Sequence, residues 1–392
     1  MDVAIVGGGI IGLTLANLLS AFSADISVMV VDGGAPAPLD LNTIDPRVIA
    51  LSKANQNLFE RLDVWESIKA SRACPYNDMF VWDGTGTADI HFEGAASRLD
   101  NIGHIIENKV IVDALLNNVS GVELLFNETV TAYEQKENKA LIVLSNGESI
   151  NASLVVAADG ARSNLRALAD FKVREWDYDH TAIVSTVTTE KPHHFTAWQR
   201  FTDDGPLAFL PLSLSEGDQH HCSIVWSTQP ERAETLMALN EDEFCRVLSR
   251  EFETKLGSVT QTEKRLSFPL RQRHASRYTR PGIVLVGDAA HTIHPLAGQG
   301  ANIGLYDVTV LSEEIARAIR RGVDLSDASI GKRYERRRQS HNLLAMSAME
   351  GFKRLFGADD PAIRWMRNEG LRFANRSAWL KQQFLKVASG HT

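Results

Sequence analysis

The segment Val3-Ala4-Ile5-Val6-Gly7-Gly8-Gly9-Ile10-Ile11-Gly12 at the start of the chain decides the fold. A β-branched run ends on spaced glycines, and residues 13–22 continue with the apolar spacing of a helix. A second strand-like run at 26–31 completes a strand–helix–strand unit, which requires a parallel sheet with a right-handed crossover. The opening therefore predicts a Rossmann-like α/β domain.

The glycines at this turn have separate tasks in binding a dinucleotide. Gly7 permits the tight turn, Gly9 lets the backbone approach the pyrophosphate, and Gly12 allows the helix to pack closely on the strand. Free N–H groups and the positive end of the helix dipole favour phosphate. Asp32, at the end of the second strand, can accept hydrogen bonds from the hydroxyls of an unphosphorylated ribose. A plain glycine turn is the alternative, and the motif alone does not separate FAD from NAD.

A second acidic position, Asp288, favours FAD. The run 283–286 returns as a buried parallel strand and ends on Gly287-Asp288, where a carboxylate can bind the ribityl hydroxyls of a flavin; NAD has no such polyol. The helix start that follows can stabilise negative charge on a reduced flavin through its N–H groups and dipole. Without a ligand, this segment would be only a strand–turn–helix connection. The residues that we predict on the flavin side are Pro295, Gly298, Gln299, Gly300, Ala301 and Asn302.

The strand pattern between these motifs indicates that the first domain is interrupted and later completed. A strand pair is expected near 79–83 and 88–92, and long alternating strands from 173 to about 270 indicate an antiparallel sheet. We predict an α/β protein in four segments: 1–172 as the first part of a FAD-binding domain with a parallel sheet, 173–270 as an antiparallel-sheet substrate domain, 271–325 as the completion of the FAD-binding domain, and 326–392 as C-terminal helices.

Composition excludes several classes of protein. The 41 basic and 49 acidic residues give a net charge of −8 without a basic patch, which argues against nucleic-acid binding. The three cysteines and twelve histidines show no metal-ligand spacing, so we expect no metal site. With no basic leader and no apolar stretch long enough to cross a bilayer, the expected location is the cytoplasm.

A middle motif, Asp159-Gly160-Ala161-Arg162-Ser163-Asn164-Leu165-Arg166, completes a set of three. Together with Gly7 to Gly12 and the Gly287-Asp288 segment, it resembles the fingerprints of the single-component FAD-dependent aromatic hydroxylases, the p-hydroxybenzoate hydroxylase-like flavoprotein monooxygenases. The resemblance implies that Asp159 serves both FAD and the transient visit of the nicotinamide donor. The alternative is that Asp159 only caps a helix, with Ser163 and Arg166 as surface neighbours.

Longer segments resemble the ring hydroxylases of ubiquinone biosynthesis. They are 45–52, 103–108, 176–178, 208–212, 222–226 and 291–300. This resemblance implies hydroxylation of the aromatic ring of a polyprenylated phenol, with NAD(P)H and O2, through a flavin C4a-hydroperoxide. It also implies Arg47 as a flavin-side contact and Glu107 as a weaker one, although Arg47 would otherwise be a solvated loop residue. His294 is the candidate for assisting phenol deprotonation, against packing within its loop.

Several alternatives remain open from the sequence. The protein could hydroxylate a small soluble phenol, or serve as a non-catalytic FAD-bearing scaffold in a biosynthetic complex. The 291–300 segment is nearest to the C5-hydroxylase branch, whereas 198–206 is nearer to the C6 branch. The strands at 209–212 and 224–226 form either a roof over the flavin or ordinary sheet core. The helix at 376–387 is a candidate for peripheral contact with the inner membrane surface, and homo-oligomers or a ubiquinone-biosynthesis complex are further possible assemblies.

Overall fold

The part of the molecule that we predict to bind FAD is built on a six-stranded sheet. In this computed structural model, which describes residues 1–22, 26–84, 89–95, 100–137, 139–292 and 299–356, its strand order is β19-β20-β12-β1-β2-β8. Five of the strands run parallel, and β19 pairs antiparallel to β20. Their bounds are β1 (Val3–Val6), β2 (Val28–Asp32), β8 (Val122–Phe126), β12 (Leu154–Ala157), β19 (Thr279–Arg280) and β20 (Ile283–Leu285).

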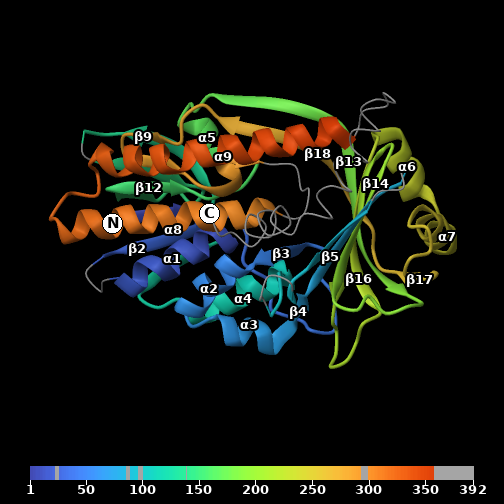
Figure 1. Cartoon of the computed structure of the whole chain (residues 1–392). Coiled ribbons are helices and arrows are strands. Elements are labelled where there is room, and N and C mark those ends of the chain that lie inside the picture. Colours follow the sequence, from blue (N-terminus) through green and yellow to red (C-terminus); the bar gives the residue numbers. More distant parts are fainter. Residues whose placement is uncertain (23–25, 85–88, 96–99, 138, 293–298, 357–392) are drawn as a thin grey trace.

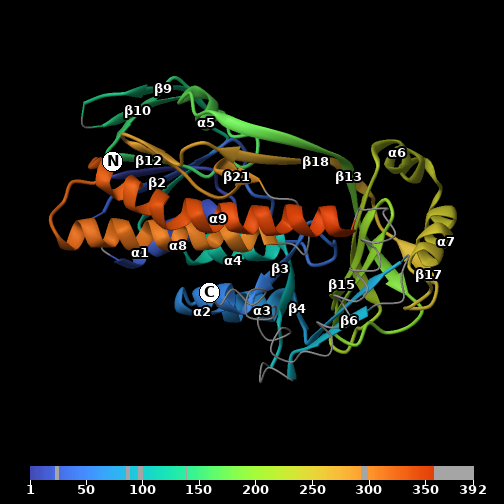
Figure 2. The ribbon, with the colours of Figure 1, turned by 45° about the horizontal axis from the view of Figure 1, so that its top comes forward.

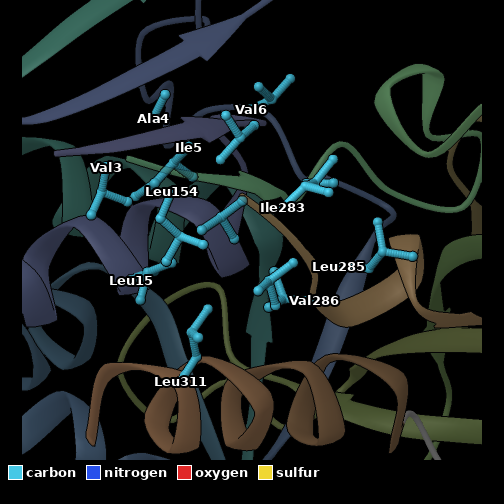
Figure 3. Packing of buried hydrophobic residues seen from close by; sticks show 14 of the residues in the cluster. Val3, Ala4, Ile5, Val6, Leu15, Leu154, Ile283, Leu285, Val286 and Leu311 are labelled. Atoms are coloured by element: carbon cyan, nitrogen blue, oxygen red, sulfur yellow. The ribbon is translucent and has the colours of Figure 1, made fainter. Parts of the chain in front are cut away.

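This sheet has a continuous apolar core. The strands are made almost wholly of buried aliphatic residues, as expected for parallel strands covered on both faces. Helices α1 (Ile10–Phe22) and α8 (Gln299–Arg320) pack together against it, with Leu15 and Leu311 reaching the strands (Figure 3). The predicted parallel domain is therefore completed by a strand and a helix that lie nearly 300 residues after β1.

Smaller elements flank the parallel sheet. The strands β9 (Val130–Gln135), β10 (Ala140–Leu144) and β11 (Ser149–Ala152) form an antiparallel meander, with Gly147 at φ +87° in the turn between β10 and β11. A second small sheet has the order β3-β7-β4, from β3 (Val48–Ser52), β4 (Ala73–Tyr76) and β7 (Gly103–Glu107). The helices beside them are α2 (Lys53–Arg61), α3 (Trp65–Arg72), α4 (Asn108–Asn118) and α5 (Asn164–Leu168).

A nine-stranded sheet stands at the other end of the molecule (Figure 1). Along its main path the order is β21-β18-β13-β16-β15-β14-β5-β6, and β17 pairs with β13. Every pairing in it is antiparallel except β14 with β5. The strands are β5 (Asp78–Asp83), β6 (Asp89–Glu93), β13 (Val173–Thr189), β14 (Thr196–Thr202), β15 (Gly205–Leu212), β16 (His221–Thr228), β17 (Val259–Thr262), β18 (Leu266–Ala275) and β21 (His291–Thr292).

The sheet draws strands from beyond the central segment of the chain. The expected strand pair near 79–83 and 88–92 is present as β5 and β6, and it extends this sheet rather than the parallel one. Strand β5 pairs in parallel with β14, with Thr196 of β14 beside Asp78 and Phe201 beside Asp83. Sequence periodicity shows that a strand exists but not which sheet it joins, and in the structure residues 78–83 and 89–93 belong with the nine-stranded sheet.

The two faces of this sheet have different neighbours. Helices α6 (Pro230–Ala238) and α7 (Glu241–Glu251) cover its outer face, on the side away from the parallel sheet (Figures 1 and 2). Phe209, Ile224 and Trp226 pack in the cluster under these helices, whereas Leu210 and Leu212 pack with β3, β4 and β7 on the inner face. Strands β15 and β16 contain the segments considered for a roof over the flavin. Only every second residue of these segments therefore lies on the inner face of the sheet.

Lowering the pH is expected to destabilise the protein between about pH 6.5 and pH 4 through two buried histidines. Burial, together with Lys53 and Lys69 nearby, lowers the pKa of His104 to about 4, and burial likewise lowers the pKa of His274 to about 4. An unfolded histidine has a pKa of about 6.5, so in this interval the unfolded chain binds more protons. As the pH is lowered through this interval, the free energy of unfolding therefore decreases. At pH 4 the decrease is on the order of 3 kcal/mol for each histidine.

Urea unfolding between pH 4 and pH 7.5 measures this dependence. His104→Gln should flatten it, while His341→Gln, on the exposed surface of a helix, should leave the wild-type curve unchanged. Equal pH dependence in wild type and His104→Gln would contradict the assignment.

Candidate cofactor site

The turn between β1 and α1 is shaped as a cradle. Gly7 adopts φ +117°, and a Cβ there would collide with the Ala158 carbonyl; a Cβ on Gly12 would collide with the Gly7 carbonyl. Gly9 is exposed, and a Cβ on it would meet nothing within 4 Å. Two glycines therefore serve internal packing, and the third presents open backbone at the start of α1, as a pyrophosphate requires.

Asp32 holds the shape of this turn. Its Oδ2 accepts the Gly8 N–H at 2.6 Å, and its Oδ1 accepts the Gly34 N–H at 2.8 Å. The carboxylate is half-buried at the carboxyl end of β2, where the sequence placed it. Each carboxylate oxygen can accept a further hydrogen bond, so the residue can bind a ribose while it fixes the loop.

The middle motif is buried against the other two. Ser163 is the N-cap of α5, and its hydroxyl accepts the Arg166 N–H at 2.9 Å. The Arg166 guanidinium is buried and donates to the carbonyls of Ala161 and Ala289, both at 2.9 Å. The alternative in which Ser163 and Arg166 are surface neighbours is therefore wrong, because Arg166 ties α5 to the turn that carries Asp288.

Asp159 has two differently placed oxygens. Its Oδ2 accepts the Leu165 N–H at 3.1 Å, so it does help to cap α5. Its Oδ1 is buried and has no hydrogen-bond partner among the described residues. A buried acceptor left unpaired is costly, and a bound donor such as a cofactor hydroxyl would satisfy it. The residue thus fits both roles considered from the sequence.

Asp288 lies in a short 3₁₀ helix, η2 (Gly287–Ala289), directly after β20. Its side chain is exposed to solvent, and the surrounding protein atoms raise the pKa of its carboxyl. Within the described part of the chain, its carboxylate makes no hydrogen bond, whereas its carbonyl accepts the Thr292 hydroxyl at 3.3 Å. The Asp288 carboxylate can therefore accept hydrogen bonds from a ligand.

The three motifs converge through backbone contacts. A Cβ on Gly7 would also strike Asp159 N, so the first turn touches the second motif directly. Gly287 packs on Ile11 of α1, and a Cβ on Gly304 of α8 would meet both Ile11 and the Gly287 Cα. Segments separated by nearly 300 residues therefore line one side of the sheet at the carboxyl ends of its parallel strands, which is where open α/β sheets bind ligands.

Helix α8 begins at Gln299, so the N–H groups of its first turn have no partner within the helix. A Cβ on Gly300 would meet nothing within 4 Å, so the backbone there is open; Ala301 follows it in the first turn. The Asn302 side chain is instead engaged with the protein: its Oδ1 accepts Ser52 N at 3.0 Å, and its Nδ2 donates to Ala50 O at 2.8 Å. His294, Pro295 and Gly298 lie outside the described residues.

Arg47 and Glu107 occupy different environments. Arg47 is exposed and forms a bidentate pair with Asp45, with both N–O distances at 3.2 Å. Glu107 is buried; its Oε1 pairs with Arg72 Nε at 2.9 Å, and its Oε2 accepts the Asp45 N–H at 2.6 Å. Burial raises the pKa of Glu107 despite these partners. Glu107 therefore anchors the loop that presents Arg47, and a flavin contact by either residue stays a prediction.

Sequence reasoning missed a buried polar cluster behind Asp288. Asp307, in the middle of α8, is fully buried and bonded to His291 and Arg338. Burial alone would raise the pKa of Asp307, but His291 and Arg338 outweigh it and hold the pKa below its ordinary value. The only signal in the sequence is an acid within the apolar face of a helix, which does not reveal its partners.

Comparison with known proteins assigns the family. A family model described as "FAD binding domain" matches residues 1–346. The chain belongs to the FAD-binding domain family. FAD as the predicted cofactor is thereby confirmed, and it fits the residues present: the open backbone at Gly9, the unpaired Asp159 Oδ1 and the exposed Asp288.

Relatives within the FAD-binding domain family confirm the narrower resemblance. The chain is 37% identical to 3-demethoxyubiquinol 3-hydroxylase of Escherichia coli, over 99% of this chain and 98% of that protein. It is 34% identical to ubiquinone hydroxylase UbiL of Rhodospirillum rubrum, over 99% and 89%. It is 32% identical to the mitochondrial ubiquinone biosynthesis monooxygenase COQ6 of Xenopus tropicalis, over 99% and 93%.

Solved structures of other proteins share the fold. The p-nitrophenol 4-monooxygenase PnpA of Pseudomonas putida superposes with a TM-score of 0.80 at 20% identity, over 100% of this chain and 98% of that one. Klebsiella pneumoniae HpxO complexed with FAD gives 0.76 at 17% identity, over 100% and 99%. The predicted α/β class with parallel and antiparallel sheets is confirmed. Among the described residues, no helix is long and apolar enough to cross a bilayer.

Proposed function

We propose that the protein hydroxylates the aromatic ring of a polyprenylated phenol in ubiquinone biosynthesis, with FAD, NAD(P)H and O2. The observation that carries the proposal is the convergence of three FAD motifs in a chain that matches ubiquinone hydroxylases over nearly its whole length. When bound, FAD supplies the activation of oxygen and its transfer to the ring.

The residues of this chain hold and orient the cofactor. The N–H groups at the start of α1 face the pyrophosphate, Asp32 accepts from the adenosine ribose, and Asp288 accepts from the ribityl chain. The first N–H groups of α8, around Gly300, stabilise negative charge at the flavin end. Asp159, through its unpaired Oδ1, accepts from the cofactor or from the visiting nicotinamide donor.

On its inner face, the nine-stranded sheet packs on the small sheet β3-β7-β4 through an apolar cluster. Ala197, Leu210 and Leu212 pack there with Tyr76 and Ile105 of the small sheet. A substrate ring with a prenyl tail would bind beside this cluster, where apolar surroundings exclude water from the reacting carbon. This side of the sheet is the substrate side in our proposal.

The polyprenyl tail also bears on location. Such a substrate partitions into lipid, so we propose that the enzyme meets it at a membrane surface while the rest of the molecule faces the cytoplasm. The helix expected at 376–387 as the contact lies outside the described residues. Flotation with vesicles that contain a prenylated phenol tests this: co-migration supports it, and protein that stays at the bottom of the gradient with and without the phenol contradicts it.

Two experiments test the reaction. In the host, deletion of the gene should cause one quinone precursor to accumulate, and its missing hydroxyl reports the ring position. In vitro, the purified holoenzyme should couple NAD(P)H oxidation to oxygenation of a prenylated phenol. Equal turnover of phenols without a prenyl tail would instead identify a small-phenol hydroxylase, and FAD binding without coupled oxygenation of any phenol would identify a scaffold.

A further inference from the structure

One carboxylate oxygen holds both ends of the turn that carries Asp288. Asp307 Oδ2 accepts the Gly287 N–H at 3.0 Å and the His291 Nε2–H at 2.5 Å. Gly287 precedes Asp288, and His291 follows it at the start of β21. The position of the Asp288 backbone is thus fixed from α8, through a residue that does not itself reach the surface.

The other oxygen of Asp307 connects the turn to α9 (Ala328–Phe356). Arg338 Nε donates to Oδ1 at 2.7 Å, and Asn342 Nδ2 approaches the same atom at 3.3 Å. Arg338 also donates to Asn342 Oδ1 at 2.7 Å and lies over the Tyr306 ring at 4.3 Å. Helices α8 and α9 run side by side at this level (Figure 2).

The cluster is electrostatically tight. Asp307, His291, Arg338 and Asn342 are all at most 2% exposed. A buried charge is tolerated only where it is paired, and the lowered pKa of Asp307 keeps it ionised between its two basic partners. Asp307 also contributes to the raised pKa of Asp288, after burial, so the two carboxylates lie within electrostatic reach.

We propose that Asp307 is a positioning residue for the cofactor: through Gly287 and His291 it sets where Asp288 meets the flavin side chain, and through Arg338 it makes α9 part of that support. The inference rests on the FAD site of the proposed function and not on the identity of the substrate. A failed hydroxylation assay would therefore not contradict the positioning role of Asp307. A protein that binds no FAD would contradict both this role and the proposed function.

The test compares two carboxylates on α8 that both pair with α9. Asp307→Asn removes the charge behind the turn. Glu314→Gln removes a buried charge about two helical turns further on, which pairs with Arg333 at 2.8 Å and Arg337 at 3.0 Å and does not contact the turn. Both variants should lower the stability of the apoprotein. Only Asp307→Asn should weaken FAD binding, by about tenfold or more, because it loosens hydrogen bonds to a charged group that orient Asp288.

Fluorescence titration of apoprotein with FAD measures the affinity, and the reduction potential of bound flavin gives a second readout that loss of helix packing alone does not move. Asp307→Asn leaves the positive charge of Arg338 uncompensated, so the potential should shift to a more positive value; Glu314→Gln should leave it unchanged. Equal losses of FAD affinity in both variants, or unchanged affinity and potential in Asp307→Asn, would overturn the proposal. If Asp307→Asn is insoluble, Asp307→Glu replaces it in the test. This variant keeps the charge but moves it, and it should also weaken FAD binding by about tenfold or more.

Discussion

Gly12→Ala is expected to destabilise the apoprotein by about 3 kcal/mol or more, before any cofactor is considered. A Cβ at this position would collide with the Gly7 carbonyl and approach Ile5 Cγ2 at 3.2 Å. The obstructing atom is backbone in a turn that Asp32 and the neighbouring strands hold in place, so it cannot move aside cheaply. Urea unfolding of the apoprotein measures the change, and FAD binding should be lost with it.

Gly9→Ala is the matched control. It lies in the same turn, but its Cβ would meet nothing in the protein within 4 Å. The apoprotein should therefore unfold within about 0.5 kcal/mol of wild type, while FAD affinity falls because the methyl group occupies the approach of the pyrophosphate. A Gly9→Ala protein that binds FAD as tightly as wild type would place the cofactor elsewhere.

Asp288→Ala should produce the second large effect, on cofactor binding alone. The carboxylate is exposed and makes no hydrogen bond among the described residues, so the protein does not depend on it for its own packing. Removing it should leave the apoprotein at least as stable as wild type. Loss of charged hydrogen bonds to the ribityl hydroxyls should weaken FAD binding by about a hundredfold.

Titration of the apoprotein with FAD, beside its thermal unfolding, separates these two outcomes. Asp288→Asn keeps an acceptor without the charge and should bind FAD with intermediate affinity. Asp177→Ala, which removes an exposed carboxylate paired with Arg271 on the nine-stranded sheet, should bind FAD as wild type does. An Asp288→Ala protein that unfolds readily but keeps its FAD affinity would make Asp288 a structural residue.

The parts predictable from sequence were those in which local chemistry and backbone geometry coincide. Gly7, Gly9 and Gly12 each require a small residue for a reason visible in the turn, and the buried runs at 3–6 and 283–286 are typical of parallel strands. The order of the motifs then predicted that these strands share one sheet, and they do, with β12 between them.

Other features depend on partners distant in sequence. Whether β5 and β6 extend the parallel or the antiparallel sheet depends on the pairing of β5 with β14, a strand more than a hundred residues later, and no local pattern encodes that. The alternation of β15, with Phe209 outward and Leu210 inward, depends on α6 and α7 covering the outer face. Asn302 and Asp307 are polar residues whose partners are contributed by other elements, so their roles emerge only in three dimensions.

The late return of the chain to its first sheet has a consequence for biosynthesis. Val155 pairs with Ile283, and α8 closes the core only after the whole nine-stranded sheet has been translated. Such non-local pairing forms slowly, because closing a long loop costs conformational entropy that is offset only after the strands have paired. During synthesis on the ribosome, residues 1–157 must therefore wait with one edge of β12 uncovered, and capture of the cofactor becomes one of the last events of maturation.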